Sequence, residues 1–298
     1  MKPIFEEEKE FLQSMDIKIP DNCWKDGSKI YLTPYDTTPL LVLQVKDDSI
    51  IIKKDNRQFL QGKRTLTISE IIHKEKDKIK SLEREAITFL NTFIDENKTT
   101  KTILAYSGGK DSDVLLEIAK KSKLKFIANW ANTSNETAET YLHVKERIGN
   151  IEHNYMNPKE GYYQWIERKK YLIPTRLMRN CCSTYKEGQL GNYYNKNKKL
   201  IQITGVRKLE SIKRSKYQKI MDYDFDVNLR GSSNIPKLWK TLAPIVEWSD
   251  LDIWIYLFIA ISFPISFYII RTTIKSTGSA SVRLSPILID VLCNFFAY

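Results

Sequence analysis

The chain has little cysteine and no recognisable export signal. Only four cysteines occur among 298 residues (Cys23, Cys181, Cys182 and Cys293), too few for a disulfide scaffold of this length. The first residues, 1–8, lack the apolar run of a signal peptide. We therefore expect a cytoplasmic, reducing location.

Charged side chains are missing from one stretch near the C-terminus. Residues 253–270 carry no charge, a length that reaches the lower limit for a membrane span. Pro264 interrupts the stretch, and its first residues continue an amphipathic helix pattern. A buried helix followed by a strand is favoured over a transmembrane helix, so a membrane is not an expected partner.

Acidic residues are outnumbered by basic ones, 36 to 47, which gives a net charge of +11 and a pI near 9.2. The 42% hydrophobic and 28% charged residues are typical of a soluble globular protein, and the length allows about two domains. The excess of positive charge favours polyanionic partners such as nucleotides or nucleic acid. A lysine-rich solvated surface is the alternative explanation.

The N-terminal part is predicted to be a small α+β module over 1–68. Residues 4–14 have the pattern of a short amphipathic helix, and β-rich runs fill 29–54. A long amphipathic helix is expected over 69–97. Three aromatic residues are expected in the core of the module rather than on a base-stacking surface: Trp24, Tyr31 and Tyr35.

A glycine turn between a strand and a helix is the central motif of the chain. The apolar run 103–106 leads into Ser-Gly-Gly-Lys-Asp-Ser at 107–112, and apolar residues then recur at helical spacing. Glycines let backbone amides approach a ligand, and a helix N-terminus attracts phosphate. Lys110 adds a positive charge, and the Ser112 hydroxyl can donate a hydrogen bond to a phosphate oxygen. The spacing differs from that of the Walker P-loop.

A second strand is predicted over 124–130, followed by a polar segment over 132–141. Thr133 and Glu136 fit a capping box that begins the next helix. Strands that alternate with helices predict a parallel sheet, in which ligands bind beyond the carboxyl ends of the strands. The 107–112 loop and the polar segment can therefore share one nucleotide.

Two basic segments follow. The first, 179–186, carries two adjacent cysteines and ends at Lys186. The second begins with a strand over 200–204, which breaks at Gly205 into the start of a charged helix. Arg207 and Arg214 are seven residues apart, about two helical turns, so both are expected to face the same side.

Together these segments resemble the phosphoadenosine phosphosulfate (PAPS) reductase family, within the PP-loop ATP pyrophosphatase superfamily. The resemblance covers about residues 100–256. Its motifs are Ser-Gly-Gly-Lys-Asp-Ser at 107–112, Asn-Thr-Ser-Asn-Glu-Thr-Ala-Glu-Thr at 132–140, Arg-x-Cys-Cys-x-x-x-Lys at 179–186, Gly-Val-Arg-x-x-Glu-Ser-x-x-Arg at 205–214 and Pro-Ile-x-x-Trp-x-x-x-Asp-Ile-Trp at 244–254.

The resemblance implies an α/β fold, a parallel doubly wound, Rossmann-like sheet of the adenine nucleotide alpha hydrolase type, over 69–256. Phosphates would be held by Ser107, Gly108, Gly109, Lys110, Asp111 and Ser112. Asn132, Thr133 and the Gly205 backbone would frame the adenosine. The implied catalytic residues are Lys110, Asp111, Lys186, Arg207 and Arg214, with Arg179 beside them. Mg²⁺ would bridge the phosphates, and Asp111 would meet it through the nucleotide.

Two departures from the family pattern matter. The intact loop resembles the members that use ATP, nearest to the sulfurtransferases of DNA phosphorothioation. Sulfonucleotide reductases usually have a degraded loop and a C-terminal Glu-Cys-Gly-x-His cysteine, and Cys293 does not match that setting. Cys181 and Cys182 resemble tandem cysteines that hold a four-iron cluster in some relatives, but the required second Cys-x-x-Cys pair is absent from the sequence. A cluster is therefore unsupported, and a structural role for this thiol segment is favoured.

From residue 257 onward the family pattern ends. Our hypothesis is that 257–298 arises from a frameshift or from an unrelated terminus. Resequencing of the locus tests it, because an uninterrupted reading frame contradicts the frameshift. If the usual end is replaced, catalytic competence is in doubt.

The resemblance implies an enzyme that binds ATP with Mg²⁺, cleaves it between the α and β phosphates and adenylylates an acceptor. Sulfur transfer to nucleic acid (DNA or tRNA), with a sulfur-donor protein as partner, is the family chemistry favoured next. One alternative is a thioredoxin-dependent reductase of PAPS or adenosine phosphosulfate. Another is a catalytically impaired nucleotide- or nucleic-acid-binding protein.

Overall fold

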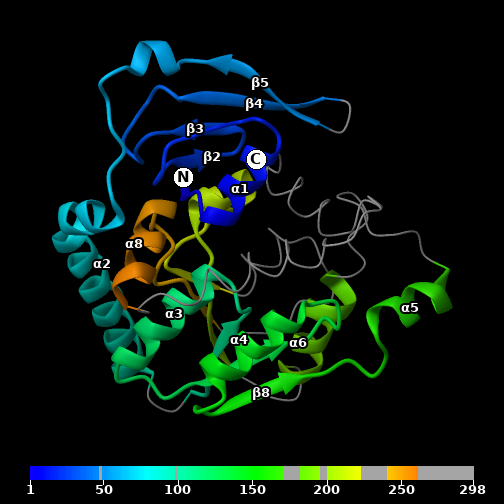
Figure 1. Ribbon diagram of the computed structural model, residues 1–298. Coiled ribbons are helices and arrows are strands. Elements are labelled where there is room, and N and C mark those ends of the chain that lie inside the picture. The colour runs from blue at the N-terminus through cyan, green and yellow to red at the C-terminus, as the bar shows by residue number, and fades with distance from the viewer. Residues whose placement is uncertain (47–48, 98–99, 171–181, 195–199, 223–239, 261–298) are drawn as a thin grey trace. The chain divides into compact units, whose positions relative to one another are not determined.

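The computed structural model describes residues 1–46, 49–97, 100–170, 182–194, 200–222 and 240–260 (Figure 1). Its residue contacts divide the chain into two compact units. The first unit combines residues 1–80 with the segment that begins at Ser249, and the second covers residues 81–248. The domain limits expected from the sequence (1–68, 69–256 and 257–298) remain predictions.

The first unit contains an antiparallel sheet in the order β1-β2-β3-β4-β5, together with helix α1 (Glu6–Ser14). The strands are β1 (Lys2–Pro3), β2 (Trp24–Asp26), β3 (Lys29–Tyr31), β4 (Leu41–Lys46) and β5 (Ser49–Asp55). A 3-10 helix, Arg57–Leu60, follows β5. The β-containing N-terminal module is thus observed.

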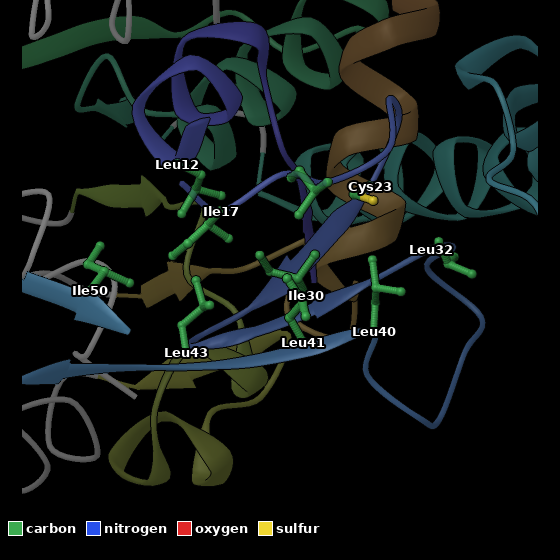
Figure 2. Close-up of a cluster of buried hydrophobic side chains, with 10 residues drawn as sticks. Leu12, Ile17, Cys23, Ile30, Leu32, Leu40, Leu41, Leu43 and Ile50 are labelled. Carbon is green, nitrogen blue, oxygen red and sulfur yellow. The ribbon is translucent and has the colours of Figure 1, made fainter. Parts of the chain in front are cut away.

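Aliphatic side chains from α1 and the strands form the core of this unit (Figure 2). Leu12 of α1 lies in one cluster with Ile30, Leu41 and Leu43. Trp24 and Tyr31 are also buried, as expected. Tyr35 is only half-buried, because its hydroxyl reaches the surface helix that follows and donates to Glu75 Oε1 (2.9 Å).

Helix α2 (Ile68–Glu96) confirms the helix expected over 69–97, and the division between the two units falls within it. Helix α8 (Asp250–Ala260) belongs to the first unit and begins at a cap in which the Ser249 hydroxyl donates to Asp252 Oδ2 (2.7 Å). Asp252 Oδ1 also lies 2.5 Å from Lys78 Nζ of α2. Among the helices of the described residues, none is long and apolar enough to cross a membrane.

The second unit is built on a sheet in the order β10-β11-β9-β6-β7-β8. All neighbouring pairs are parallel except β10 and β11. The strands are β6 (Thr102–Tyr106), β7 (Ile127–Ala131), β8 (His153–Met156), β9 (Ile201–Ile203), β10 (Ile220–Asp222) and β11 (Lys240–Leu242). This arrangement confirms the predicted α/β class with a parallel sheet.

Helices α3 (Lys110–Lys121) and α4 (Ala138–Ile148) alternate with β6, β7 and β8 along the chain. Helix α5 (Tyr162–Lys169), a π-helical turn (Cys182–Glu187) and α6 (Gly188–Tyr194) precede β9. Because β7 and β8 extend the sheet on one side of β6 while β9 and β11 extend it on the other, the strand order reverses between β6 and β9. Such a reversal is where doubly wound sheets bind ligands.

Two local predictions were wrong. Helix α4 begins after Thr137, whose side chain accepts from Thr140 N, so Thr133 and Glu136 are not its capping box. Instead Thr133 Oγ1 donates to Glu136 Oε1 (2.8 Å) within the preceding turn. The segment after Gly205 forms two 3-10 helices, Lys208–Glu210 and Ile212–Lys216, because Ser211 between them is extended. Arg207 and Arg214 therefore do not lie two turns apart on one α-helix.

Several predictions fall on residues outside the described ranges. These include the positions of Arg179 and Cys181, the uncharged stretch beyond residue 260, and Cys293.

Candidate functional site

The glycine turn after β6 has the geometry that its sequence predicts. Gly108 has φ +75°, a left-handed conformation that disfavours other residues. A Cβ at Gly108 would also lie 3.0 Å from Val144 Cγ2 of α4. Gly109 is extended and forms the N-cap of α3, so Lys110 is the first helical residue. The loop thus delivers the chain from the end of β6 directly to a helix N-terminus.

Serine hydroxyls link the two ends of this loop. Ser107 Oγ donates to Ser112 Oγ (3.1 Å), and Ser112 Oγ lies 2.8 Å from the Gly109 carbonyl oxygen. The Gly109 amide donates to Ser107 Oγ (3.4 Å). These groups lie at the N-terminus of α3, where the first amides of a helix lack acceptors within the helix, a position suited to phosphate.

A buried cluster holds the loop from behind. Asp113 is fully buried, and its Oδ1 accepts from Tyr106 Oη (2.7 Å) and Arg147 Nε (3.2 Å). Its Oδ2 lies 2.9 Å from His143 Nε2. Burial, together with the charge of Asp113, raises the pKa of Tyr106 well above its ordinary value, so the phenol remains a donor. Tyr106 and Asp113 flank the 107–112 loop, and their contact fixes both of its ends.

The sequence did not single out this cluster as functional. Its one available signal was Asp113, a charged residue beside the apolar positions of α3. The pattern of α3 could not reveal that His143 and Arg147 of another helix would be its partners.

The segment after β9 packs against the same loop. A Cβ at Gly205 would lie 2.9 Å from the Asp111 carbonyl oxygen and 3.3 Å from the Ser112 amide nitrogen. Only a glycine lets these two backbones approach so closely. Gly205 therefore lies beside the loop, and its role toward adenosine stays a prediction.

Arg207 is a buried cation next to that contact, with 1% of its surface exposed. Its Nε donates to Asp111 Oδ1 (2.6 Å), and one terminal nitrogen donates to the Trp248 carbonyl oxygen (3.2 Å). Lys110 Nζ lies 2.8 Å from the other Asp111 oxygen. Asp111 is thus held between two cations, and neither Lys110 nor Arg207 lines the cavity described next.

A cavity of about 260 Å³ lies at the carboxyl ends of β6, β7 and β9. It is lined by strand residues, the glycine loop and residues from the later basic segments: Ala105, Tyr106, Ser107, Gly109, Asp111, Ser112, Asn129, Trp130, Ala131, Glu136, Lys186, Leu190, Thr204, Gly205, Val206, Glu210 and Arg214. A wider, open hollow of about 690 Å³ lies at the opposite edge of the sheet, lined in part by Thr100, Leu124 and Glu152. The first cavity is the candidate site, because it contains the glycine loop at the reversal of strand order.

Two cationic side chains that line this cavity, Arg214 and Lys186, differ in their partners and exposure. Arg214 forms an ion pair with Glu210, whose Oε2 also accepts from the Arg207 amide (3.0 Å). Lys186 is exposed, and no carboxylate in the described part of the chain pairs with it. The neighbouring Tyr185 is buried, and its hydroxyl donates to the carbonyl oxygens of Glu160 (3.0 Å) and Gly161 (3.1 Å). Tyr185 therefore anchors the π-helical turn from which Lys186 reaches the cavity.

Asn132 and Thr133 lie beside the cavity rather than among the residues that line it. Asn132 Oδ1 accepts from the Ser134 amide (2.7 Å) and from Tyr141 Oη (2.8 Å). Gln189 Nε2 donates to the Asn132 carbonyl oxygen (2.8 Å) and so links α6 to the end of β7. These bonds shape the β7 edge of the site, while Ala131 and Glu136 on either side form its surface. The role of Asn132 and Thr133 toward adenosine stays a prediction.

The carboxylates that line the cavity could help to hold Mg²⁺ only when the ion is bound to a nucleotide. Asp111, Glu136 and Glu210 line the cavity, but cations already pair with Asp111 and Glu210. Within the described ranges, no group of three or more His, Cys, Asp or Glu side chains could hold a metal ion by itself. Cys182 begins the π-helical turn, so the chain continues directly from the thiol segment to Lys186.

Comparison with known proteins identifies related chains. A family model described as "Phosphoadenosine phosphosulfate reductase domain" matches residues 101–260, more than half of the chain. Two uncharacterized proteins of Methanocaldococcus jannaschii are similar: MJ0066 is 30% identical over 68% of this chain, and MJ0973 is 26% identical over 64%. The chain spans less than half of each, 42% and 44% of their lengths respectively.

A solved structure is also similar in part. It is the phosphoadenylyl-sulfate (PAPS) reductase from Candida auris in a phosphate complex, with a TM-score of 0.43 and 15% identity. The match covers 68% of this chain and 91% of that one.

Proposed function

This chain belongs to the phosphoadenosine phosphosulfate reductase domain family, and from that premise we propose that it is an ATP-cleaving enzyme. It binds ATP as its magnesium complex and cleaves it between the α and β phosphates. An acceptor takes up the adenylyl group and pyrophosphate is released. One observation carries this proposal: Ser107, Gly109, Asp111 and Ser112 of the glycine loop line a cavity that is also lined by Lys186 and Arg214.

The loop supplies the phosphate site. The amides at the start of α3 offer hydrogen-bond donors to phosphate oxygens. The hydroxyls of Ser107 and Ser112 become donors to the phosphate when they rotate away from their present acceptors in the loop. The Tyr106–Asp113 contact holds these donors in place before the nucleotide arrives, so little ordering accompanies binding. Mg²⁺ is part of the substrate and neutralises charge on the phosphate oxygens.

The cations promote the transfer itself. An acceptor oxygen attacks the α-phosphorus while the bond from that atom to the α–β bridging oxygen breaks. The electron pair of the broken bond leaves with pyrophosphate. Lys186 and Arg214 of the cavity stabilise this developing negative charge, and Lys110 and Arg207 hold Asp111 beside them.

We further propose nucleic acid as the acceptor and sulfur transfer as the subsequent chemistry. The net charge of +11 suits a polyanionic substrate, and the loop resembles that of the ATP-using sulfurtransferases of DNA phosphorothioation. A partner protein would supply the sulfur.

The test is to identify the products formed from ATP labelled at the α-phosphate, with and without DNA or tRNA. The proposal predicts AMP or an adenylylated acceptor together with pyrophosphate, and no ADP. Lys110→Ala should reduce pyrophosphate release by at least about a hundredfold, because the loop loses the positive charge that the family resemblance assigns to the phosphates and Asp111 loses one of its two cations. Lys120→Ala is the matched control, because Lys120 lies in the last turn of the same helix and pairs with Glu117.

Other outcomes point to the alternatives. Pyrophosphate release at the wild-type rate by Lys110→Ala contradicts the site assignment. Turnover of PAPS with thioredoxin, and none of ATP, would assign the chain to the sulfonucleotide reductases. Salt-dependent DNA binding without any turnover would make it a binding protein.

A further inference from the structure

One polar side chain that lines the cavity, Asn129, has no role in the proposed phosphate chemistry. Asn129 lies on β7, has 1% of its surface exposed, and is among the residues that line the cavity. A central strand position at this depth ordinarily takes an apolar residue, because burial of an amide is costly unless its hydrogen bonds are made. The Asn129 amide therefore needs a partner for each of its groups.

Only its oxygen has a partner in the described structure. Asn154 Nδ2 donates to Asn129 Oδ1 (2.8 Å) and also to Tyr193 Oη (3.1 Å). Asn129 Nδ2 is buried and has no acceptor among the described residues. In this arrangement Asn154 engages the Asn129 oxygen, and the Asn129 NH₂ group remains available as a donor.

The surroundings of Asn129 suit a flat heterocycle rather than a phosphate. Its cross-strand partner on β6 is Ala105, which leaves room above the sheet, and Leu190 and Ala131 also line the cavity. The serine hydroxyls and cations lie at the loop and in the later basic segments. The cavity thus combines a polar, phosphate-binding part with an apolar part that contains one unsatisfied donor.

We propose that Asn129 determines base specificity by donating a hydrogen bond to an acceptor ring nitrogen of the adenine base. This inference rests on the proposed function, since it requires that the ligand be an adenine nucleotide. A donor at this position favours a base edge that presents an acceptor and rejects one that presents another N–H. Rejection follows because two donors would then face each other in a buried site.

The experiment compares dissociation constants for ATP and its 1-deaza, 3-deaza and 7-deaza analogues, each lacking one ring acceptor. The wild type should bind one of the three about tenfold more weakly than ATP, which corresponds to one buried hydrogen bond. Asn129→Leu should bind ATP about tenfold more weakly and should no longer distinguish that analogue from ATP. Asn129→Asp retains an acceptor for Asn154 and should show the same loss of discrimination, which guards against a folding defect in the leucine variant.

Asn91→Leu is the matched control. Asn91 lies on α2 in the same unit and accepts from the Lys123 amide, away from the cavity. It should leave the discrimination between ATP and the deaza analogues at its wild-type value. If both Asn129 variants discriminate among the analogues as the wild type does, the inference is overturned while ATP binding stands. If the wild type binds no ATP, the proposed function itself fails.

Discussion

Replacement of Gly205 by alanine tests whether the position of the glycine loop depends on its close backbone contact with the segment after β9. Gly205 does not have a left-handed φ, so alanine is compatible with its backbone conformation. The new Cβ would nevertheless lie 2.9 Å from the Asp111 carbonyl oxygen and 3.0 Å from the Asp111 carbonyl carbon. Both are backbone atoms in the first turn of α3. They cannot rotate away as a side chain could, so the glycine loop or the β9 segment must shift.

The size of the effect follows from this overlap. Forcing one extra methyl into a packed region costs about 1–3 kcal/mol. For a unit of this size, a loss of 1 kcal/mol lowers the thermal midpoint by about 2–4 °C, so a drop of about 2–12 °C is expected. The displaced loop should also bind nucleotide about tenfold more weakly, because the hydrogen-bond donors at 107–112 would no longer point toward the same phosphate position.

The assay is thermal unfolding of Gly205→Ala with and without Mg-ATP, together with calorimetric titration of the nucleotide. Gly161→Ala is the matched control. There the new Cβ would lie 3.4 Å from Gln164 Oε1, an ordinary contact, at φ −65°. The control should change the free energy of unfolding by less than about 1 kcal/mol and leave ATP affinity unaltered. If Gly205→Ala matches the wild type in both midpoint and affinity, the close backbone approach is not what fixes the loop.

Three further perturbations test separate parts of the molecule. Asp113→Ala should lower the free energy of unfolding by about 3–5 kcal/mol in urea titration, because Arg147 and His143 lose their buried carboxylate; an unchanged midpoint would contradict the cluster's role. Lys186→Ala should weaken Mg-ATP binding about tenfold in a calorimetric titration, whereas Lys216→Ala, outside the cavity, should not. Burial opposes ionisation of Glu8, but Lys2 and Lys25 outweigh it and lower the pKa of Glu8 below 4.5. The unfolded chain therefore binds the proton more tightly, so the thermal midpoint should fall as pH drops below about 4.5, and Glu8→Gln should reduce that slope.

The long helix, the glycine turn and strands β6, β7 and β9 could be predicted because each depends on neighbours along the chain, whereas β8, β10 and β11 were not predicted. Gly108 and Gly109 stand between an apolar run and a helical spacing, which is enough to specify a strand, a turn and a helix. The alternation of strands with helices also predicts a parallel sheet, but it does not specify the order of the strands, which the structure supplies. The position of the cavity at the ends of β6 and β9 agrees with that pattern.

The details of the site could not be predicted because they depend on pairings between distant segments. Asp111 contacts Arg207, and Asp113 contacts His143 and Arg147, across separations that periodicity does not reveal. Glu210 accepts from the Arg207 backbone amide and pairs with the Arg214 guanidinium, whereas the Arg207 guanidinium binds Asp111.

The start of α4 was misplaced for a different reason. Thr133 has Glu136 three positions later, as a capping box requires, whereas Thr137 has Thr140 there. Thr137 nevertheless caps α4, because its side-chain oxygen alone accepts from the Thr140 amide. Ser134, which adopts a left-handed φ of 55°, forms a turn that delays the helix.

Calorimetric titration of the protein with Mg-ATP and, separately, with PAPS tests the central claim most directly. We expect one site for Mg-ATP, weakened by Lys110→Ala and unaffected by Lys120→Ala, with PAPS bound more weakly than ATP. Binding of PAPS in preference to ATP, or of neither nucleotide, would contradict it.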